Sequence, residues 1–169
     1  MSEPTNDAFH PDLTERAGHT AALRTRVHHV RAGELDGNTA QTGGMTRLAA
    51  VSGQRVGSRA IWMGETHVAP STASDNHHHG ESETAIYVVS GHPAFVFAEG
   101  DREVRLETEP GDYIFVPPYL PHREENPDAE VEAVVVISRT TQEAIVVNLG
   151  ALDWAEVRTS DPGSADAAC

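Results

Sequence analysis

Short apolar segments separated by turn residues run through the middle of this chain. They are rich in Val, Ile, Tyr and Phe, and several end at turn signals such as Ser90-Gly91 or the Glu-Pro-Gly-Asp run at 109–112. Segments of this length and composition predict β-strands. The expected strands are Val27–Arg31, Met45–Val51, Ser58–Thr66, Thr84–Ser90, His92–Ala98, Arg102–Leu106, Tyr113–Val116, Ala133–Ser138 and Ala144–Asn148.

Many short strands without a long helical period between them are typical of an antiparallel sandwich or barrel. The fold class predicted from this pattern is all-β, with one β-barrel at residues 27–150 and no internal repeat or second domain. Residues 1–26 are polar and lack clear periodicity, which indicates a flexible N-terminal arm with a short helix around Thr14–Arg24. Residues 151–169 are expected to form a C-terminal tail that ends in small and acidic residues.

Composition narrows the possible partners. The 169 residues suffice for one domain with a real core, and 38% of them are hydrophobic. The formal net charge is -14, and every basic residue is an arginine. Nucleic acids and anionic membranes carry the same sign of charge, so neither is an expected partner.

Cysteine use and the start of the chain bear on location. Cys169 is the only cysteine, so neither an intramolecular disulfide nor a thiolate metal cluster can form. The first residues lack the apolar core of a signal peptide, and no apolar run approaches the ~20 residues of a membrane span. We therefore expect a cytoplasmic protein.

Two separated segments supply three histidines and a carboxylate. His77 and His79 stand at alternate positions, so their side chains point to the same side of an extended strand. Glu83 keeps this parity provided that the turn at Gly80 does not shift the register, and His122 comes from a later segment. This arrangement predicts a mononuclear metal site inside the barrel. His78 has the opposite parity and is expected to face outward.

These segments resemble the two signature motifs of the cupin superfamily. The second motif matches at Gly111, Pro117, His122 and Asn126 with the family spacing, and it departs at Tyr119, where the family usually has glycine.

The first motif matches at His77, His79 and Glu83, although the leading glycine is absent. Seven residues rather than six separate Glu83 from Gly91, so that the family's carboxylate position, counted back from Gly91, falls on Thr84.

The resemblance implies a small jelly-roll barrel, one divalent metal ion and, often, a homodimer. Within the family the matching positions, His77, His79, Glu83 and His122, would be the ligands. Neutral imidazole suits Zn, Fe, Ni and Cu, and a carboxylate extends the set to Mn. The sequence does not decide among these five metals. Dimerisation is also expected because exposed strand edges are often covered by a second subunit.

Four further residues are candidates for binding a small-molecule substrate. Tyr87 shares the parity of Glu83, so it either lines the barrel or packs in the core, and Trp62 either walls the cavity or fills it. Arg47 either orients a polar substrate or lies on the surface, and Tyr119 is expected to narrow the cavity near His122.

Three polar residues that follow His122 have other expected roles. Glu124 and Glu125 are alternatives for a general base, but adjacent acids in a polar stretch usually face solvent. Asn126 is expected to stabilise a turn.

Several functions fit these expectations. The favoured one is Lewis-acid cyclisation, isomerisation or lyase chemistry on a carbonyl-bearing aromatic or polyketide-like substrate. It is favoured because the histidine-bearing segments resemble those of small bacterial cupins that act as zinc-containing polyketide cyclases. An O2-dependent dioxygenase and a non-catalytic small-molecule-binding cupin are the alternatives. A sugar epimerase is less favoured, since the chain has no lysine for a phosphate group.

Overall fold

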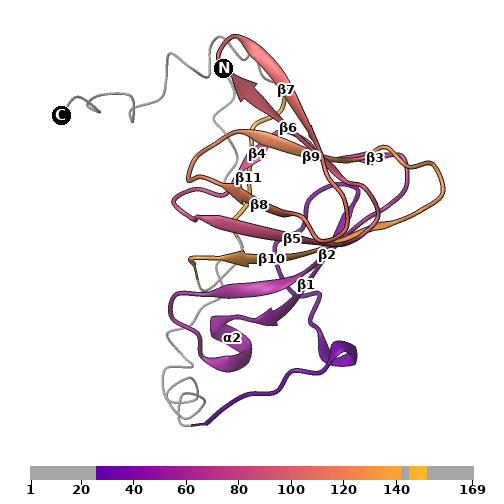
Figure 1. The fold of residues 1–169 in the computed structure, drawn as a ribbon. Coiled ribbons are helices and arrows are strands. Elements are labelled where there is room, and N and C mark those ends of the chain that lie inside the picture. The colour runs from indigo at the N-terminus through magenta and orange to yellow at the C-terminus, as the bar shows by residue number, and fades with distance from the viewer. Residues whose placement is uncertain (1–25, 142–144, 152–169) are drawn as a thin grey trace.

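Two antiparallel sheets form the jelly-roll barrel (Figure 1), which we describe from a computed structural model covering residues 26–141 and 145–151. The strands are β1 (Met45–Val51), β2 (Trp62–Val68), β3 (Thr72–Ala73), β4 (His77–His78), β5 (Thr84–Ser90), β6 (Ala94–Glu99), β7 (Arg102–Glu107), β8 (Tyr113–Val116), β9 (His122–Asn126), β10 (Ala133–Arg139) and β11 (Val147–Asn148). A 3-10 turn, η1 (Ala32–Glu34), and one short helix, α2 (Gly53–Val56), complete the described elements.

Strands that are distant in sequence lie side by side in both sheets. The five-stranded sheet has the order β1-β2-β10-β5-β8, and the other sheet has the order β11-β4-β9-β6-β7, with β3 paired to β9. Within the described residues every strand pairing is antiparallel. Strand β10 therefore enters the middle of the first sheet, between β2 and β5, as its label in Figure 1 shows.

Alternating burial along the strands builds the core between the sheets. In β10, for example, Ala133, Val135, Ile137 and Arg139 are buried while the residues between them are partly exposed. Val, Ile, Phe and Trp side chains from both sheets form the main apolar cluster. Full burial of one such side chain contributes roughly 1.5–3 kcal/mol, so period-two patterning drives the sheets together.

The predicted all-β class is confirmed, and the strands rich in β-branched and aromatic residues were predicted best. Strands β1, β5 and β8 have the predicted bounds, whereas residues 27–31 form no strand and β2 ends at Val68. The short polar strands β3, β4 and β9 were not predicted, because their composition gives no propensity signal. The predicted helix around Thr14–Arg24, most of the arm and nearly all of the tail lie outside the described residues, so those domain limits stay predictions.

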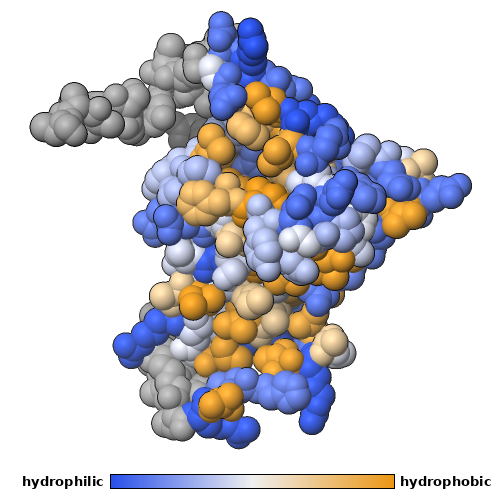
Figure 2. Space-filling view, viewed as in Figure 1, coloured by the Kyte–Doolittle hydropathy of each residue, from blue (hydrophilic) through white to orange (hydrophobic). Residues whose placement is uncertain are grey.

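One face of the five-stranded sheet carries exposed apolar side chains. Met63, Tyr87, Val89, Tyr113 and Phe115 are each at least 38% exposed. Figure 2 shows hydrophobic residues gathered in the lower part of the view, where β1 and α2 lie. Among the described helices, none has the length and apolar character needed to cross a membrane.

Candidate metal centre

Three imidazoles and one carboxylate meet in the barrel interior. They belong to His77, His79, His122 and Glu124, all four are buried, and the ligand atoms they offer lie within 4.8 Å of one another. The centroids of the three imidazole rings are 4.6–5.1 Å apart. A set this compact can surround a single ion.

Pairing of β4 with β9 positions the set. His77 and His122 are register partners in this pairing, although 45 residues separate them in sequence. His79 follows two positions after His77, and Glu124 two positions after His122, so strand alternation directs each pair inward.

Backbone carbonyl groups fix the orientation of all three imidazoles. The Nδ1 atoms of His77, His79 and His122 lie 2.9 Å, 3.1 Å and 2.9 Å from the carbonyl oxygens of Asp75, Ile145 and Leu120. A carbonyl oxygen only accepts hydrogen bonds, so each Nδ1 carries the proton and each Nε2 keeps its lone pair. This is the tautomer a metal-binding histidine needs, and such outer partners hold the ring in place.

Burial also keeps the imidazoles neutral. Loss of hydration lowers the pKa of His77 and of His79 well below the ordinary value. Electrostatic repulsion that protonation would bring, mainly with His122 for His77 and with Arg139 for His79, lowers both further. Burial lowers the pKa of His122 too, although the Glu124 carboxylate opposes this. Neutral imidazole is the form that binds metal, so no proton has to leave before coordination at neutral pH.

The unpaired atoms of the cluster fit a metal ion. Within the described residues, the Nε2 atoms of His77 and His122 and the Oε1 atom of Glu124 are buried without a hydrogen-bond partner. Such an atom costs about 1–3 kcal/mol when nothing binds it. Three imidazoles and one carboxylate suit Zn, Fe, Ni, Cu or Mn, and coordination would satisfy all three orphaned atoms together.

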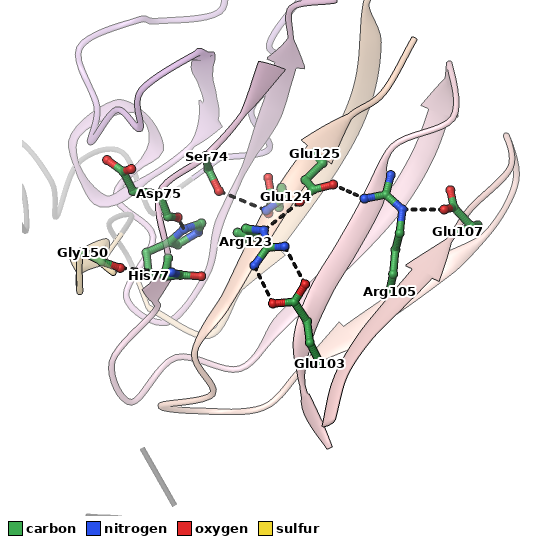
Figure 3. Close-up of polar contacts among 11 residues, drawn as sticks. Ser74, Asp75, His77, Glu103, Arg105, Glu107, Arg123, Glu124, Glu125 and Gly150 are labelled. Carbon is green, nitrogen blue, oxygen red and sulfur yellow. Dashed lines mark hydrogen bonds and ion pairs between the residues drawn. The ribbon is translucent and has the colours of Figure 1, made fainter. Parts of the chain in front are cut away.

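Strand β9 separates two adjacent acids onto opposite faces of the sheet. The backbone N–H of Glu124 donates to Ser74 Oγ at 3.0 Å, and the Ser74 N–H donates to the Glu124 carbonyl at 2.8 Å, which ties the strand to the segment before His77. Glu125 accepts hydrogen bonds from Arg123 and Arg105 on the outer face (Figure 3). The prediction that both acids face solvent is therefore wrong for Glu124, and Glu125 is partly exposed on the outer face.

Comparison with known proteins agrees with the fold described above. Residues 64–138 match the family model described as a cupin domain, and both sheets contribute strands to this range. The chain therefore contains a cupin domain. A search of curated protein sequences gives no match.

The solved structures that share this fold are described as proteins with different activities. The polyketide cyclase RemF from Streptomyces resistomycificus is 22% identical, with a TM-score of 0.56 over 82% of this cupin and 94% of that chain. Oxalate decarboxylase from Bacillus subtilis is 22% identical, with a TM-score of 0.57 over 66% of this cupin. Peruvianin-I, described as a cysteine peptidase from Thevetia peruviana latex, is 15% identical, with a TM-score of 0.56 over 64% of this cupin and 69% of that chain.

The shared length differs greatly among these structures. This cupin covers 29% of the oxalate decarboxylase chain, so the match extends over less than a third of that protein. At these identities the similarity establishes the fold and leaves the activity open.

The structure does not bring Glu83 to the three imidazoles. The backbone turns at Gly80, where φ is +57°, and the Ser82 N–H donates to the carbonyl of His79. Burial falls on the odd positions His77 and His79 and on even positions from Ser82 to Val88, so Glu83 is exposed and Thr84 is buried. The condition that the Gly80 turn keeps the register is thus not met, and Glu124 supplies the carboxylate instead.

The four residues predicted to bind substrate lie in different parts of the structure. Tyr87 lies on the outer face, with its ring 4.9 Å from that of Tyr113, so it neither lines the interior nor packs in the core. Tyr119 is 61% exposed, has a φ of 59°, and lies 5.8 Å from the His78 ring, measured between centroids. Trp62 is completely buried in the core.

Arg47 lies inside the barrel and not on the surface. Its guanidinium donates to the carbonyl of Ala40 and to Thr42 Oγ1, and it is fully buried. Burial lowers its pKa, and the Glu124 carboxylate works against that change.

A second buried arginine was missed by sequence reasoning. Arg139 ends β10, and its Nη2 atom lies 3.4 Å from Nε2 of His79. The available signal was its parity with Val135 and Ile137, which places it on the inward face of the strand.

Proposed function

We propose that this cupin is a mononuclear metal-dependent enzyme that acts on a small organic molecule. The observation that carries the proposal is the compact, buried set of His77, His79, His122 and Glu124, with each Nδ1 engaged by a backbone carbonyl. A bound divalent ion supplies Lewis acidity or redox chemistry. The protein contributes a fixed donor set, neutral imidazoles and a surrounding interior that shields the reacting groups from water.

We favour Lewis-acid cyclisation, isomerisation or lyase chemistry on a carbonyl-bearing aromatic or polyketide-like substrate. The similarity to a polyketide cyclase supports this choice, because the match extends over 82% of this chain and 94% of that enzyme. A Lewis acid polarises a carbonyl oxygen without an exchange of electrons. Zinc would be the expected metal for such chemistry.

Two alternatives remain in the proposal. Oxygen-dependent chemistry is compatible with the donor set, and neighbours of the fold include an oxalate oxidase and an oxalate decarboxylase described with Mn(II) centres. A binding protein without catalysis would use the same barrel.

A homodimer and a cytoplasmic location stay predictions. The candidate contact of the homodimer is the exposed apolar face of the five-stranded sheet.

The test is elemental analysis by plasma mass spectrometry on tag-free protein purified without a nickel column. Near-stoichiometric zinc supports the favoured chemistry and directs screening to carbonyl-bearing aromatic substrates. Near-stoichiometric iron, nickel, copper or manganese favours oxygen chemistry, and oxygen uptake with candidate substrates then decides. Absence of metal, with none taken up on reconstitution, overturns the proposal in favour of a binding protein.

A further inference from the structure

Positive charge exceeds negative charge inside the barrel. Among the described residues, the buried side chains that carry a formal charge are Arg47, Arg139 and Glu124. Each of the three imidazoles has its Nδ1 at a backbone carbonyl and offers its Nε2 lone pair to the interior. Guanidinium groups stay protonated in proteins, so two cations face one carboxylate in a chain whose net charge is -14.

Arg139 presents an unused hydrogen-bonding edge. Its Nη1 donates to the carbonyl of Ile145 at 3.2 Å, its Nη2 lies 3.4 Å from His79 Nε2, and its Nε has no partner within the described residues. Nε and Nη2 form one edge of the guanidinium, with two parallel N–H groups. That fork matches the two oxygens of a carboxylate.

Metal binding would free this edge of Arg139 for a ligand. The contact of Nη2 uses the lone pair of His79 Nε2, which is the atom that His79 offers to a metal. Once that lone pair is committed, Nη2 has no acceptor there, and both donors of the edge are unpaired. A buried charged donor without an acceptor is costly, so a ligand anion would be favoured at this place.

The neighbours of Arg139 extend the polar surface. In the five-stranded sheet its register partners are Thr84 on β5 and Trp62 on β2, and both are completely buried. Thr84 Oγ1 and Trp62 Nε1 have no hydrogen-bond partner among the described residues. The Trp62 ring also lies below the guanidinium, 5.7 Å from Cζ to the ring centroid, which holds the fork in place.

Arg47 serves a different purpose. Two of its nitrogens already donate to Ala40 and Thr42, which anchors the segment before β1. The Glu124 carboxylate opposes the effect of burial on the pKa of both arginines, so it does not distinguish them. Arg47 Nη2 keeps its acceptor, Thr42 Oγ1, whereas the acceptor of Arg139 Nη2 is an atom offered to the metal. Arg139 is therefore the arginine left for a ligand.

We infer that the Nε–Nη2 edge of Arg139, with Thr84 and Trp62 beside it, binds the carboxylate of a small organic acid next to His79. The substrate class is then a carboxylic acid whose other functional groups lie toward the three histidines. The assignment of this acid as a substrate rests on the proposed function. Binding of the carboxylate does not, because it uses only side chains of this chain.

The test compares small acids with the matching amides in the protein as purified. Acetate, propanoate and benzoate are titrated against acetamide, propanamide and benzamide at constant ionic strength, in a buffer without carboxylates. The readouts are the melting temperature and the 1H–15N resonance of the Arg139 Nε–H group. The acids are expected to raise the melting temperature and shift this resonance, whereas the amides, which have the same shape without the charge, leave both unchanged.

Variants assign the effect to one side chain. Arg139→Gln is expected to weaken acid binding by at least about tenfold, because a charged hydrogen bond is lost. Arg123→Gln removes the same charge from the outer face and is expected to bind acids like the wild type. Equal effects of acids and amides, or unchanged acid affinity in Arg139→Gln, would overturn the assignment.

A second variant at Arg139 and a measurement of metal content complete the test. If Arg139→Gln does not fold, Arg139→Lys, which keeps the charge but loses the fork, is expected to bind acids more weakly. An Arg139 resonance in the wild type that does not respond to any acid contradicts the site. Metal content is measured in parallel: acid binding without metal uptake removes the proposed enzyme and leaves the carboxylate site, and metal uptake without acid binding does the reverse.

Discussion

His77 and His122 are register partners on β4 and β9, and their ring centroids lie 4.6 Å apart. Both strands are short and polar, so this pairing is not driven by their own propensity. The pairing brings the two histidine-bearing segments together, and it places the available Nε2 atoms on the same side of the sheet. The metal set therefore depends on one strand contact.

Loss of any one imidazole should abolish tight metal binding. His77→Ala, His79→Ala and His122→Ala each remove one of four ligands, and we expect affinity to fall by more than the roughly 10–100-fold typical of losing an outer partner. Competition with a chelator, followed by elemental analysis, measures this. Full metal retention in any of the three variants would contradict the site.

The two glutamates give a matched comparison for the carboxylate ligand. Glu124→Gln removes a buried charge from the cluster, and we expect metal affinity at least about tenfold lower. Glu83→Gln makes the same chemical change at an exposed position and should leave metal affinity unchanged. Isothermal titration with zinc and cobalt measures both. The reverse pattern would return Glu83 to the ligand set and show that the Gly80 turn keeps the register.

Close packing at Gly64 should make even a methyl group destabilising. A Cβ atom there would lie 2.1 Å from the carbonyl oxygen of Leu48 and 2.7 Å from the Trp62 ring. We expect Gly64→Ala to lower the free energy of unfolding by about 1–3 kcal/mol, as overpacking does. In the control Gly37→Ala, the added atom meets Leu48 Cδ2 at an ordinary 3.7 Å. Urea unfolding compares the two variants, and equal stabilities would argue against the tight contact between β1 and β2.

His67 on β2 should make stability depend on pH. Its hydrogen bond to Glu132 raises its pKa, partial burial opposes this, and Glu65 adds to the increase. A folded-state pKa above the unfolded value of 6.5 stabilises the protein below pH 6.5, and this contribution is lost as pH rises through the folded value. We expect the wild type to exceed His67→Gln by about 1 kcal/mol or less near pH 6, and by nothing at alkaline pH.

Thermal unfolding over a series of pH values tests this dependence. His29→Gln, a change at an exposed histidine outside the strands, is the matched control and should not alter the profile. A stability difference between wild type and His67→Gln that grows with rising pH would have the wrong sign and would refute the role of Glu132.

The sequence by itself determined the class of the fold and three members of the site. The bounds of β1, β5 and β8 followed from short apolar segments that end at turn residues, because strand composition and turn signals are local properties. Alternate spacing likewise identified His77 and His79, and the second cupin motif identified His122.

Only the tertiary structure decided which carboxylate joins them and what else lies inside. Within a strand parity follows from sequence, but the turn at Gly80 changes it between His79 and Ser82. Glu124 faces inward because a polar segment becomes strand β9 through its pairing with β4 and β6, which no local propensity indicates. Arg139 reaches His79 across 60 residues of sequence, since contacts between the two sheets depend on how the strands assemble.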